Sequence, residues 1–199
     1  TSLREGVPVE VQAVQTIADG IAVKRPGELT LPIIKELVDD VVEVSEEEIA
    51  KAIFHCVQNN RLVVEGAGAA GLAAVLAKKV KIEPGDTVCT VLCGGNIDGN
   101  LLARILEQVL VNQGRYIILK LLVKDRPGGL AKLLACVAAS GANVIEVFHR
   151  RAMWLAPLGQ VGIEMVLEVR DEQHGREVVR HLEETNYHVE REGQGDWED

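Results

Sequence analysis

The residues with the most evident chemistry lie in the stretch VLCGGNID, residues 91–98. An apolar run ends at Leu92, and the thiol of Cys93 is followed at once by Gly94 and Gly95. Open α/β sheets bind ligands at the carboxyl ends of their strands, and two adjacent glycines let a ligand approach the backbone closely. The alternative is a tight turn after a small buried core residue, which is how a free cysteine usually behaves. The residues alone favour this buried thiol.

A second glycine-rich stretch, residues 66–71, reads GAGAAG and contains G-x-G-x-x-G between a predicted strand and a predicted helix. In dinucleotide-binding domains such glycines seat a pyrophosphate on the helix N-terminus. The acid expected at the end of the next strand is absent, because that strand ends at Cys93, and Glu65 places a carboxylate beside the loop. These residues favour helix–strand packing on small side chains, with nucleotide binding as the weaker alternative.

The composition argues against several classes of partner. The 199-residue chain is 47% hydrophobic and carries a formal net charge of −9, which disfavours nucleic acids and anionic membranes. No apolar run is long enough to cross a bilayer, and residues 1–5 show no signal-peptide pattern. The cysteines form no CxxC pair and have no histidine at metal-ligand spacing, so we expect reduced thiols in a cytoplasmic protein without a metal site. These cysteines are Cys56, Cys89, Cys93 and Cys136.

Residues 1–112 show an alternation of predicted strands and helices. Short apolar runs indicate strands, and apolar residues at helical spacing indicate helices. The predicted strands are Ile21–Val23, Val41–Val44, Leu62–Val64 and Thr87–Leu92. The predicted helices are Leu29–Val38, a segment that begins at a Ser45–Glu48 capping box, Gly68–Lys79 and Leu101–Val111. This α/β alternation predicts a mostly parallel sheet.

Residues 113–115 form a predicted linker, after which the pattern changes to β-α-β-β-α-β. The predicted strands are Tyr116–Val123, Asn143–Arg151, Gln160–Arg170 and Tyr187–Arg191, and the predicted helices are Asp125–Ser140 and Gln173–Glu184. This order over residues 116–191 is that of the ferredoxin-like fold. Residues 192–199 form an acidic, glycine-containing tail that we expect to be disordered. We assign the histidines outside the second strand to the surface, namely His55, His174, His181 and His188.

Residues of about 1–112 resemble the threonine and serine dehydratases, which are pyridoxal phosphate enzymes of the tryptophan-synthase-β fold type. Four stretches carry the resemblance in order and spacing: Thr16–Val23, Leu37–Asp40, Val64–Gly71 and Leu92–Asp98. The resemblance implies that this part is the C-terminal portion of a catalytic domain with a mostly parallel sheet.

Residues 116–191 resemble an ACT domain, a module that senses amino acids. Lys124–Leu130 is similar to the signature of its first loop, and Gly141–Ile145 is similar to that of its second strand. A dehydratase domain followed by one ACT domain is typical of the single-ACT threonine ammonia-lyases. The resemblance therefore implies conversion of L-threonine into 2-oxobutanoate and ammonia, in isoleucine biosynthesis or in threonine catabolism.

The resemblance also implies a set of residues beside the cofactor, pyridoxal phosphate. Cys93 matches the residue that hydrogen-bonds the pyridine nitrogen, and a neutral thiol does not hold that nitrogen protonated, which suits β-elimination. The glycines after it give clearance for the ring, an acid lies close to the ring, and a backbone segment lines the pocket. The residues assigned in this way are Cys93, Gly94, Gly95, Glu65, Asp19 and Gly20.

Two parts that this chemistry requires are not recognisable in the chain. The family's Schiff-base lysine lies in a distinctive N-terminal segment, and none of Lys24, Lys78 and Lys120 has that context. The glycine run that holds the cofactor phosphate is also missing. We therefore expect no catalytic residue in this chain, no retained cofactor and no turnover by the chain alone. The alternative function is a stand-alone module that binds amino acids and forms dimers.

The ACT resemblance implies an effector site and a homo-oligomer paired edge to edge. Backbone N–H groups of the first loop would hold the carboxylate of isoleucine or valine, Asn143 would hold its amino group, and the next two residues would lie near its side chain. The assigned residues are Asp125, Pro127, Gly128, Gly129, Asn143, Val144 and Ile145. The alternative is an ordinary helix N-cap at Asp125 and a turn residue at Asn143.

Overall fold

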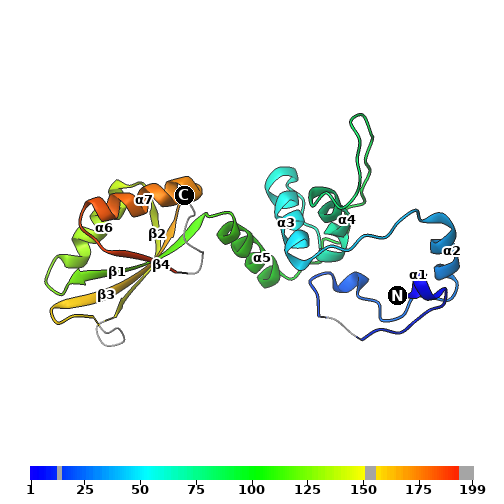
Figure 1. Ribbon diagram of the computed structural model, residues 1–199, viewed down its shortest axis with the longest axis horizontal. Coiled ribbons are helices and arrows are strands. Elements are labelled where there is room, and N and C mark those ends of the chain that lie inside the picture. The colour runs from blue at the N-terminus through cyan, green and yellow to red at the C-terminus, as the bar shows by residue number, and fades with distance from the viewer. Residues whose placement is uncertain (13–14, 151–155, 193–199) are drawn as a thin grey trace. The chain divides into compact units, whose positions relative to one another are not determined.

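The computed structural model describes residues 1–12, 15–150 and 156–192. The chain divides into two compact units, Thr1–Val109 (unit 1) and Leu110–Asp199 (unit 2), and each is described by itself (Figure 1). The division falls inside helix α5, shortly before the predicted linker at residues 113–115. The predicted tail lies outside the described residues from residue 193 onward. Among the residues that the structure describes, no helix has the length and apolar character needed to cross a membrane.

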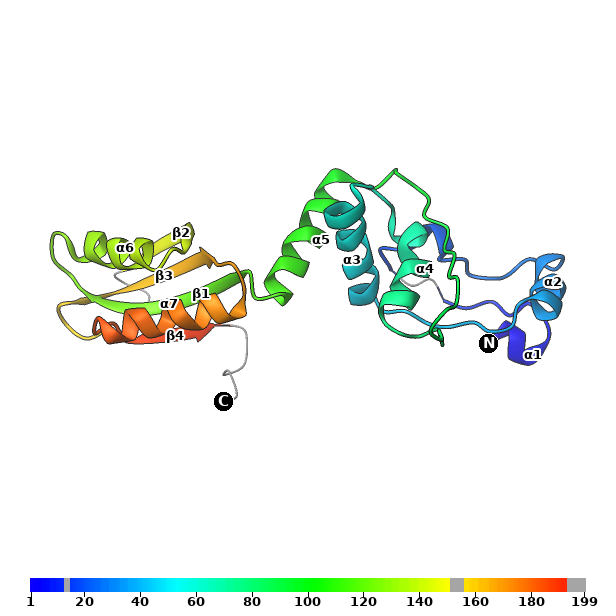
Figure 2. The same ribbon diagram turned by 90° about the horizontal axis from the view of Figure 1, so that it is seen from above.

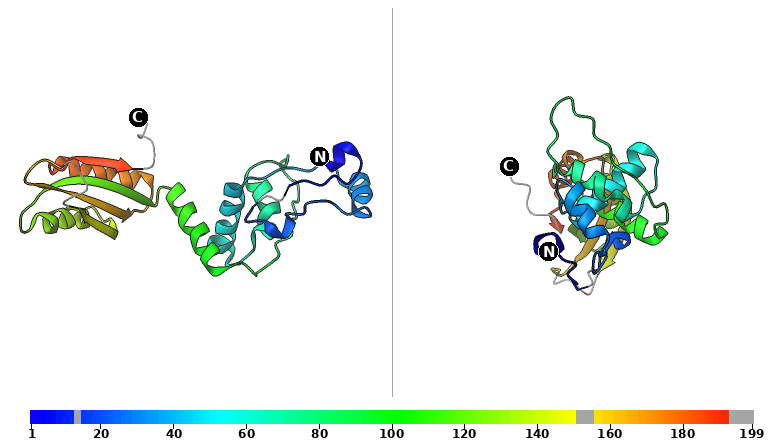
Figure 3. Two further views of the ribbon diagram at one scale, coloured as in Figure 1. Left: turned by 90° about the horizontal axis from the view of Figure 1, so that it is seen from below. Right: turned by 90° about the vertical axis from the view of Figure 1, so that its right-hand side faces the viewer.

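Unit 1 is built from helices joined by long irregular segments. Helices α3 and α4 pack side by side, and α5 adds two buried residues, Ile105 and Val109, to the same core (Figure 2). Part of the segment between α4 and α5 projects as a long loop (Figure 3). The helices are α1 (Ser2–Glu5), η1 (Asp19–Ile21), α2 (Thr30–Leu37), α3 (Glu46–His55), η2 (Cys56–Asn60), α4 (Gly66–Leu76) and α5 (Gly99–Asn112).

The predicted capping box at the start of α3 is confirmed. The Ser45 hydroxyl accepts from the N–H of Glu48 at 3.2 Å, and the Glu48 carboxylate accepts from the N–H of Ser45 at 2.8 Å. Two donors of the first helical turn are thereby satisfied. Ile49 and Ile53, four residues apart, consequently lie on the inner face of α3, where both are buried.

The predicted parallel sheet is not present in the described part of residues 1–112, where no strand is assigned. One backbone hydrogen bond joins the residues just after the third and fourth predicted strands, from the N–H of Glu65 to the carbonyl of Gly94 at 2.5 Å. A ladder needs a repeating series of such bonds. Two apolar residues of the predicted helix Leu29–Val38 are also largely exposed, with Leu29 85% and Leu37 72% accessible.

Unit 2 is a four-stranded antiparallel sheet covered by two helices. Its elements are β1 (Tyr116–Lys124), α6 (Gly129–Ala139), β2 (Asn143–Arg150), β3 (Gln160–Glu168), α7 (Glu172–Glu184) and β4 (Val189–Glu192), and the strand order in space is β2-β3-β1-β4. The order of strands and helices agrees with the expected one. Helix α6 begins later than predicted, after a left-handed Gly128 with φ +83°.

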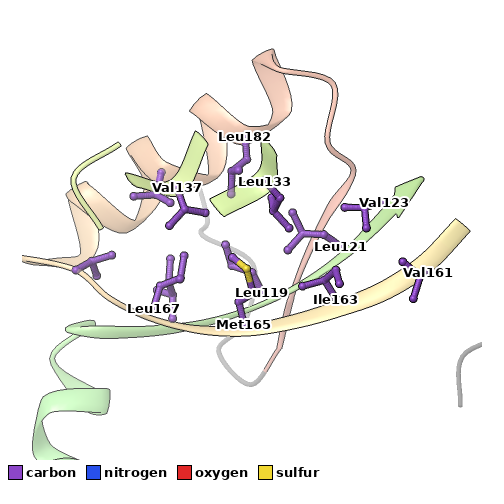
Figure 4. Close-up of a cluster of buried hydrophobic side chains, with 13 residues drawn as sticks. Leu119, Leu121, Val123, Leu133, Val137, Val161, Ile163, Met165, Leu167 and Leu182 are labelled. Carbon is purple, nitrogen blue, oxygen red and sulfur yellow. The ribbon is translucent and has the colours of Figure 1, made fainter. Parts of the chain in front are cut away.

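The core of unit 2 lies between one face of the sheet and the two helices. Burial alternates along β1, where Ile117, Leu119, Leu121 and Val123 face the helices, as the period of two in a strand requires. Figure 4 shows Leu133, Val137 and Leu182 of the helices pointing toward Leu119, Leu121, Ile163 and Met165 of the sheet. The alternation of apolar residues along each strand agrees here with the pairing of the strands in the sheet. The strands therefore lie close to their predicted positions in the chain.

His174 is buried, contrary to its assignment to the surface, with 3% of its area exposed. Its Nδ1 accepts from the N–H of Arg170 at 3.1 Å, so Nε2 carries the hydrogen and donates to the carbonyl of Ser140 at 2.9 Å. The imidazole therefore links the start of α7 to the end of α6. The sequence shows no charge partner or motif that distinguishes this histidine.

Candidate functional site

Three segments that are far apart in the sequence meet at the N-terminus of α4. A Cβ atom built on Gly66 would overlap the carbonyl of Ile17, and one built on Gly20 would lie 3.0 Å from the Cβ of Ala67. The segment of residues 17–20 therefore lies directly against the first turn of α4. Only glycine permits the approach at position 66, because the obstructing atoms belong to the backbone.

The other side of the same helix contacts the segment that precedes the CGG turn. A Cβ on Gly68 would overlap the carbonyl of Cys93, and a Cβ on Gly71 would overlap the hydroxyl of Thr90. These contacts explain why three glycines recur in the G-x-G-x-x-G stretch, since α4 is closely packed on both sides. Packing on small residues was the favoured sequence interpretation, and the structure agrees with it, although the packed segment is not a strand.

Glu65 and Gly94 form the centre of this junction. Gly94 has a φ of +73°, and a Cβ added there would overlap the side chain of Glu65. The backbone of Glu65 is also bonded to the carbonyl of Gly94. The carboxylate therefore lies over the turn, and its Oε1 is 3.5 Å from a Cβ built on Gly20. The structure thus brings Glu65, Gly94 and Gly20 together.

Cys93 is exposed, so the interpretation of a buried core thiol is wrong. Its carbonyl packs on α4 while its thiol remains accessible. Asp19 and Gly95 are also exposed, and a Cβ on Gly95 would find one atom, the carbonyl oxygen of Val63, at 3.9 Å. An accessible thiol beside open space is what a ligand-facing residue requires.

Glu46 positions the segment of residues 16–18, a role that the sequence analysis missed. Its carboxylate accepts from the hydroxyl of Thr16 and, at 2.9 Å, from the N–H of Ile17. The Thr16 hydroxyl in turn accepts from the N–H of Ala18 at 3.0 Å. Helix α3 therefore holds the backbone that leads to Asp19. The sequence shows Glu46 as part of an acidic first turn, but no pattern in it links Glu46 to Thr16 and Ile17.

The junction fits one wall of a site for a flat aromatic cofactor but not the whole site. Glycines provide clearance that side chains would fill, and Cys93 and Glu65 supply an accessible thiol and a carboxylate at its margin. The converging segments, residues 15–20, 65–71 and 90–95, contain no lysine or arginine. They therefore offer neither a nucleophilic amine nor a cation for a phosphate. Within the described residues, no group of His, Cys, Asp and Glu could hold a metal ion.

The residues assigned to an effector lie at two opposite ends of the sheet of unit 2. Asp125, Pro127 and Gly128 line a cavity of about 530 Å³ at the end of β1. Asn143 pairs with Glu168, at the end where β1 begins, and its Nδ2 donates to the Glu168 carboxylate at 3.2 Å. A single chain therefore does not unite them. Asp125 is also not an N-cap, because Gly128 takes that position, and Asn143 opens β2 instead of a turn.

Val144 and Ile145 accompany Asn143 at the start of β2, and the strand is irregular there. The register shifts between Val144 and Glu146, so that Ile145 has no partner on β3. Val144 packs against the core, whereas Ile145 is exposed. Gly129, the last of the assigned residues, lines a second cavity. The assigned residues at the end of β1 and those at the start of β2 therefore do not meet in a single chain.

Residues 1–94 match the family "Pyridoxal-phosphate dependent enzyme". The chain is 47% identical to the L-threonine ammonia-lyase of Thermotoga maritima over 188 residues, which cover 94% of this chain and 46% of that protein. It is 46% identical to the L-threonine ammonia-lyase of Geobacter sulfurreducens, with the same coverage. A solved structure of the threonine deaminase of T.th. is 37% identical with a TM-score of 0.45, and the match covers 49% of this chain and 35% of that one. The chain thus spans about half the length of the curated relatives it matches.

Proposed function

We propose that this chain is part of a cytoplasmic, pyridoxal-phosphate dependent L-threonine ammonia-lyase that serves isoleucine biosynthesis or threonine catabolism. The observation that carries the proposal is the 47% identity over 94% of the chain. This match is too long to lie within unit 1, so it extends into unit 2. The relatives named L-threonine ammonia-lyase therefore share residues of both units.

In this function the junction at α4 forms one wall of the cofactor site. Cys93 would hold the pyridine nitrogen of the cofactor, and Glu65, Gly94, Gly95, Asp19 and Gly20 would lie around it. Pyridoxal phosphate, when bound, supplies electron withdrawal from the α-carbon of the substrate. The thiol of Cys93 would contribute a hydrogen bond without a positive charge. The residues that form the Schiff base and hold the phosphate would come from outside the segments that meet here.

Unit 2 is proposed to be a ferredoxin-like ACT domain that binds isoleucine or valine between two copies. Because β2 is an edge strand, two copies could pair antiparallel through it. Such pairing would place Asn143 of one copy near the last residues of β2 of the other, where His149 lines the 530 Å³ cavity. The second copy would thus supply Asn143, which in a single chain lies at the opposite end of the sheet from this cavity.

A chimera tests the enzymatic proposal. The matched segment of the Thermotoga maritima enzyme is replaced by the corresponding residues of this chain, and 2-oxobutanoate formed from L-threonine is measured. We expect turnover by the chimera and none by the 199-residue chain alone, with or without added cofactor. A folded chimera that binds the cofactor but leaves threonine unchanged would contradict the proposal.

Calorimetry tests the effector site separately. We expect the 199-residue chain to bind isoleucine or valine, and Asn143→Ala to lose most of that binding. Sedimentation of the same samples should show at least a dimer. Binding by the chain together with an inactive chimera would favour a stand-alone amino-acid module. Absence of binding by either amino acid would remove the assignment of a sensor.

A further inference from the structure

Unit 2 contains a second cavity, of about 640 Å³, which shares Lys124 and Arg126 with the first cavity and includes Gly129 of the residues assigned to the effector. It opens where β1 ends, on the side of α7 and β4, and its volume is in the range of sites for small molecules. The walls come from β1, the first turns of α6, the start of β3 and the loop between α7 and β4. The lining includes Lys124, Arg126, Gly129, Lys132, Asn186 and Tyr187.

The charges around this cavity have one sign. Lys124, Arg126 and Lys132 line it, and no aspartate or glutamate among the described residues does. This contrasts with the chain as a whole, in which 30 acidic residues outnumber 21 basic ones. Among the described residues, none of these three side chains has an ion pair or a hydrogen bond. These three cations lie on the exposed part of the wall, and a concave wall lined by charges of one sign concentrates their field.

The N-terminal end of α6 lies at the same cavity, where the N–H of Gly129 donates to the carbonyl of Arg126 at 3.0 Å. Gly129 is the first residue of α6, an 11-residue helix, and the N-cap Gly128 provides no side-chain acceptor for the first turn. The N-terminal end of a helix carries a partial positive charge. A Cβ on Gly129 would lie 2.6 Å from the carbonyl oxygen of Lys124, so glycine is needed where the cavity wall turns into the helix.

The opposite wall is a rigid turn with polar side chains. Asn186 takes a left-handed φ of +65°, and the N–H of Tyr187 donates to the carbonyl of Leu182 at 3.0 Å, which closes the end of α7. Burial raises the pKa of Tyr187, with a further contribution from Cys136. The phenol therefore remains a neutral hydroxyl at physiological pH.

We propose that this cavity binds a small phosphate-bearing anion, held by Lys124, Arg126 and Lys132 together with the start of α6. Three cations and the partial positive charge at the start of α6 match the several acceptor oxygens and the double charge of a phosphate group. The site is independent of the proposed lyase activity, since it uses residues of unit 2 alone. Lys132 belongs to this cavity and does not line the one assigned to the amino-acid effector.

Titration calorimetry of the 199-residue chain tests this site, with inorganic phosphate and pyrophosphate as probes at constant ionic strength. We expect saturable binding that is tighter for pyrophosphate. Lys132→Gln should weaken it about tenfold, because a hydrogen bond to a charged group is lost. The matched control is Arg180→Gln, which removes one positive charge from the exposed surface of α7 and should leave the affinity unchanged.

Two results would overturn the site. One is the absence of saturable heat with both probes. The other is an equal loss of affinity in Lys132→Gln and Arg180→Gln, which would show a general response to net charge. Amide shifts in NMR spectra give an independent readout. Phosphate should shift Gly129 and Asn186 in the unsubstituted chain, and shifts spread evenly over the surface of unit 2 would count against the proposal.

Discussion

Cys93 combines a backbone that is packed on α4 with a thiol that remains accessible. In the chimera with the Thermotoga maritima enzyme, we expect Cys93→Ser to keep most of the threonine turnover, because a hydroxyl can replace the hydrogen bond to the cofactor. Cys93→Ala should lower kcat about tenfold, since one hydrogen bond of about 1.4 kcal/mol corresponds to that factor. Equal rates for Cys93→Ala and the unsubstituted chimera would refute the assigned role.

Gly68 is predicted to tolerate no side chain. Gly68→Ala would place a methyl group on the carbonyl of Cys93 and should destabilise unit 1 by about 1–3 kcal/mol, as overpacking does. Gly99→Ala is the matched control, because a Cβ there meets no atom within 4 Å. Urea unfolding of the two variants gives the comparison, and similar midpoints would mean that the segments at α4 separate easily.

His174 is predicted to stabilise unit 2 through both of its ring nitrogens. His174→Ala would leave the N–H of Arg170 and the carbonyl of Ser140 without this partner, at a cost of about 1–3 kcal/mol for each buried group left unsatisfied. His188→Ala, at an exposed position, should be close to neutral. Thermal unfolding measures both variants. Equal melting temperatures would show that the link between α6 and α7 contributes little.

At the scale of elements, the capping box of α3 predicts a pH dependence. The bond from the N–H of Ser45 chiefly lowers the pKa of Glu48 below its ordinary value of 4.5, and Lys79 adds to this effect. A lowered pKa in the folded state means that the stabilisation is complete above pH 4.5 and disappears as the pH falls through the folded value. Glu48→Gln should flatten the dependence of the unfolding midpoint on pH in this acidic range.

The control for this experiment is Glu47→Gln. Glu47 lies in the same turn of α3 and makes no capping contact, so its removal changes the net charge equally. Below pH 4.5, the unfolding midpoint of Glu47→Gln should change with pH as steeply as that of the unsubstituted chain. If both variants flatten the slope to the same extent, net charge and not the capping box is responsible.

The helices of eight or more residues could be predicted from the sequence, whereas the strands predicted for unit 1 are absent from its described residues. A helix depends on neighbours three and four residues away and on caps such as Ser45, all of which are local. A strand depends on hydrogen bonds from another segment, and the segment predicted as Thr87–Leu92 finds none in the described residues that would make a ladder. In unit 2 the partners of each strand lie within the same 77 residues from 116 to 192, so the pattern there was sufficient.

The candidate wall could be found from the sequence only in part. Cys93, Gly94 and Glu65 were identified because they stand in recognisable stretches, and the structure brings Glu65 and Gly94 into contact. The role of Glu46 could not be predicted, since its partners Thr16 and Ile17 lie some 30 residues away and no pattern links them. The exposure of Cys93 was also not encoded in its neighbours, because free cysteines are usually buried.

At the scale of the whole molecule, the two units differ in how much apolar surface they bury. Unit 2 encloses most of its large apolar side chains between helices and sheet. Unit 1 leaves many exposed, including Leu29, Leu37 and Val91, the last with 76% of its area accessible. Exposed apolar patches of this kind mark surfaces that another part of a protein covers.

We therefore predict different behaviour of the separated units. The fragment of residues 110–199 should unfold in one cooperative transition, because its core is complete. The fragment of residues 1–109 should bind a hydrophobic dye and unfold gradually. Near-ultraviolet circular dichroism and dye fluorescence distinguish these outcomes. A sharp transition for residues 1–109 without dye binding would show that the exposed apolar side chains need no cover.

The two edges of the sheet in unit 2 are unequal. β2 offers eight residues to a neighbouring strand, whereas β4 offers four at the other edge within the described residues. If two copies join through β2, the longer edge of each is consumed, and only short edges remain at the ends of the combined sheet. Short edge strands are poor templates for adding further chains. Assembly by this route would therefore stop at a closed pair, which protects a concentrated solution of the protein from growth into fibrils.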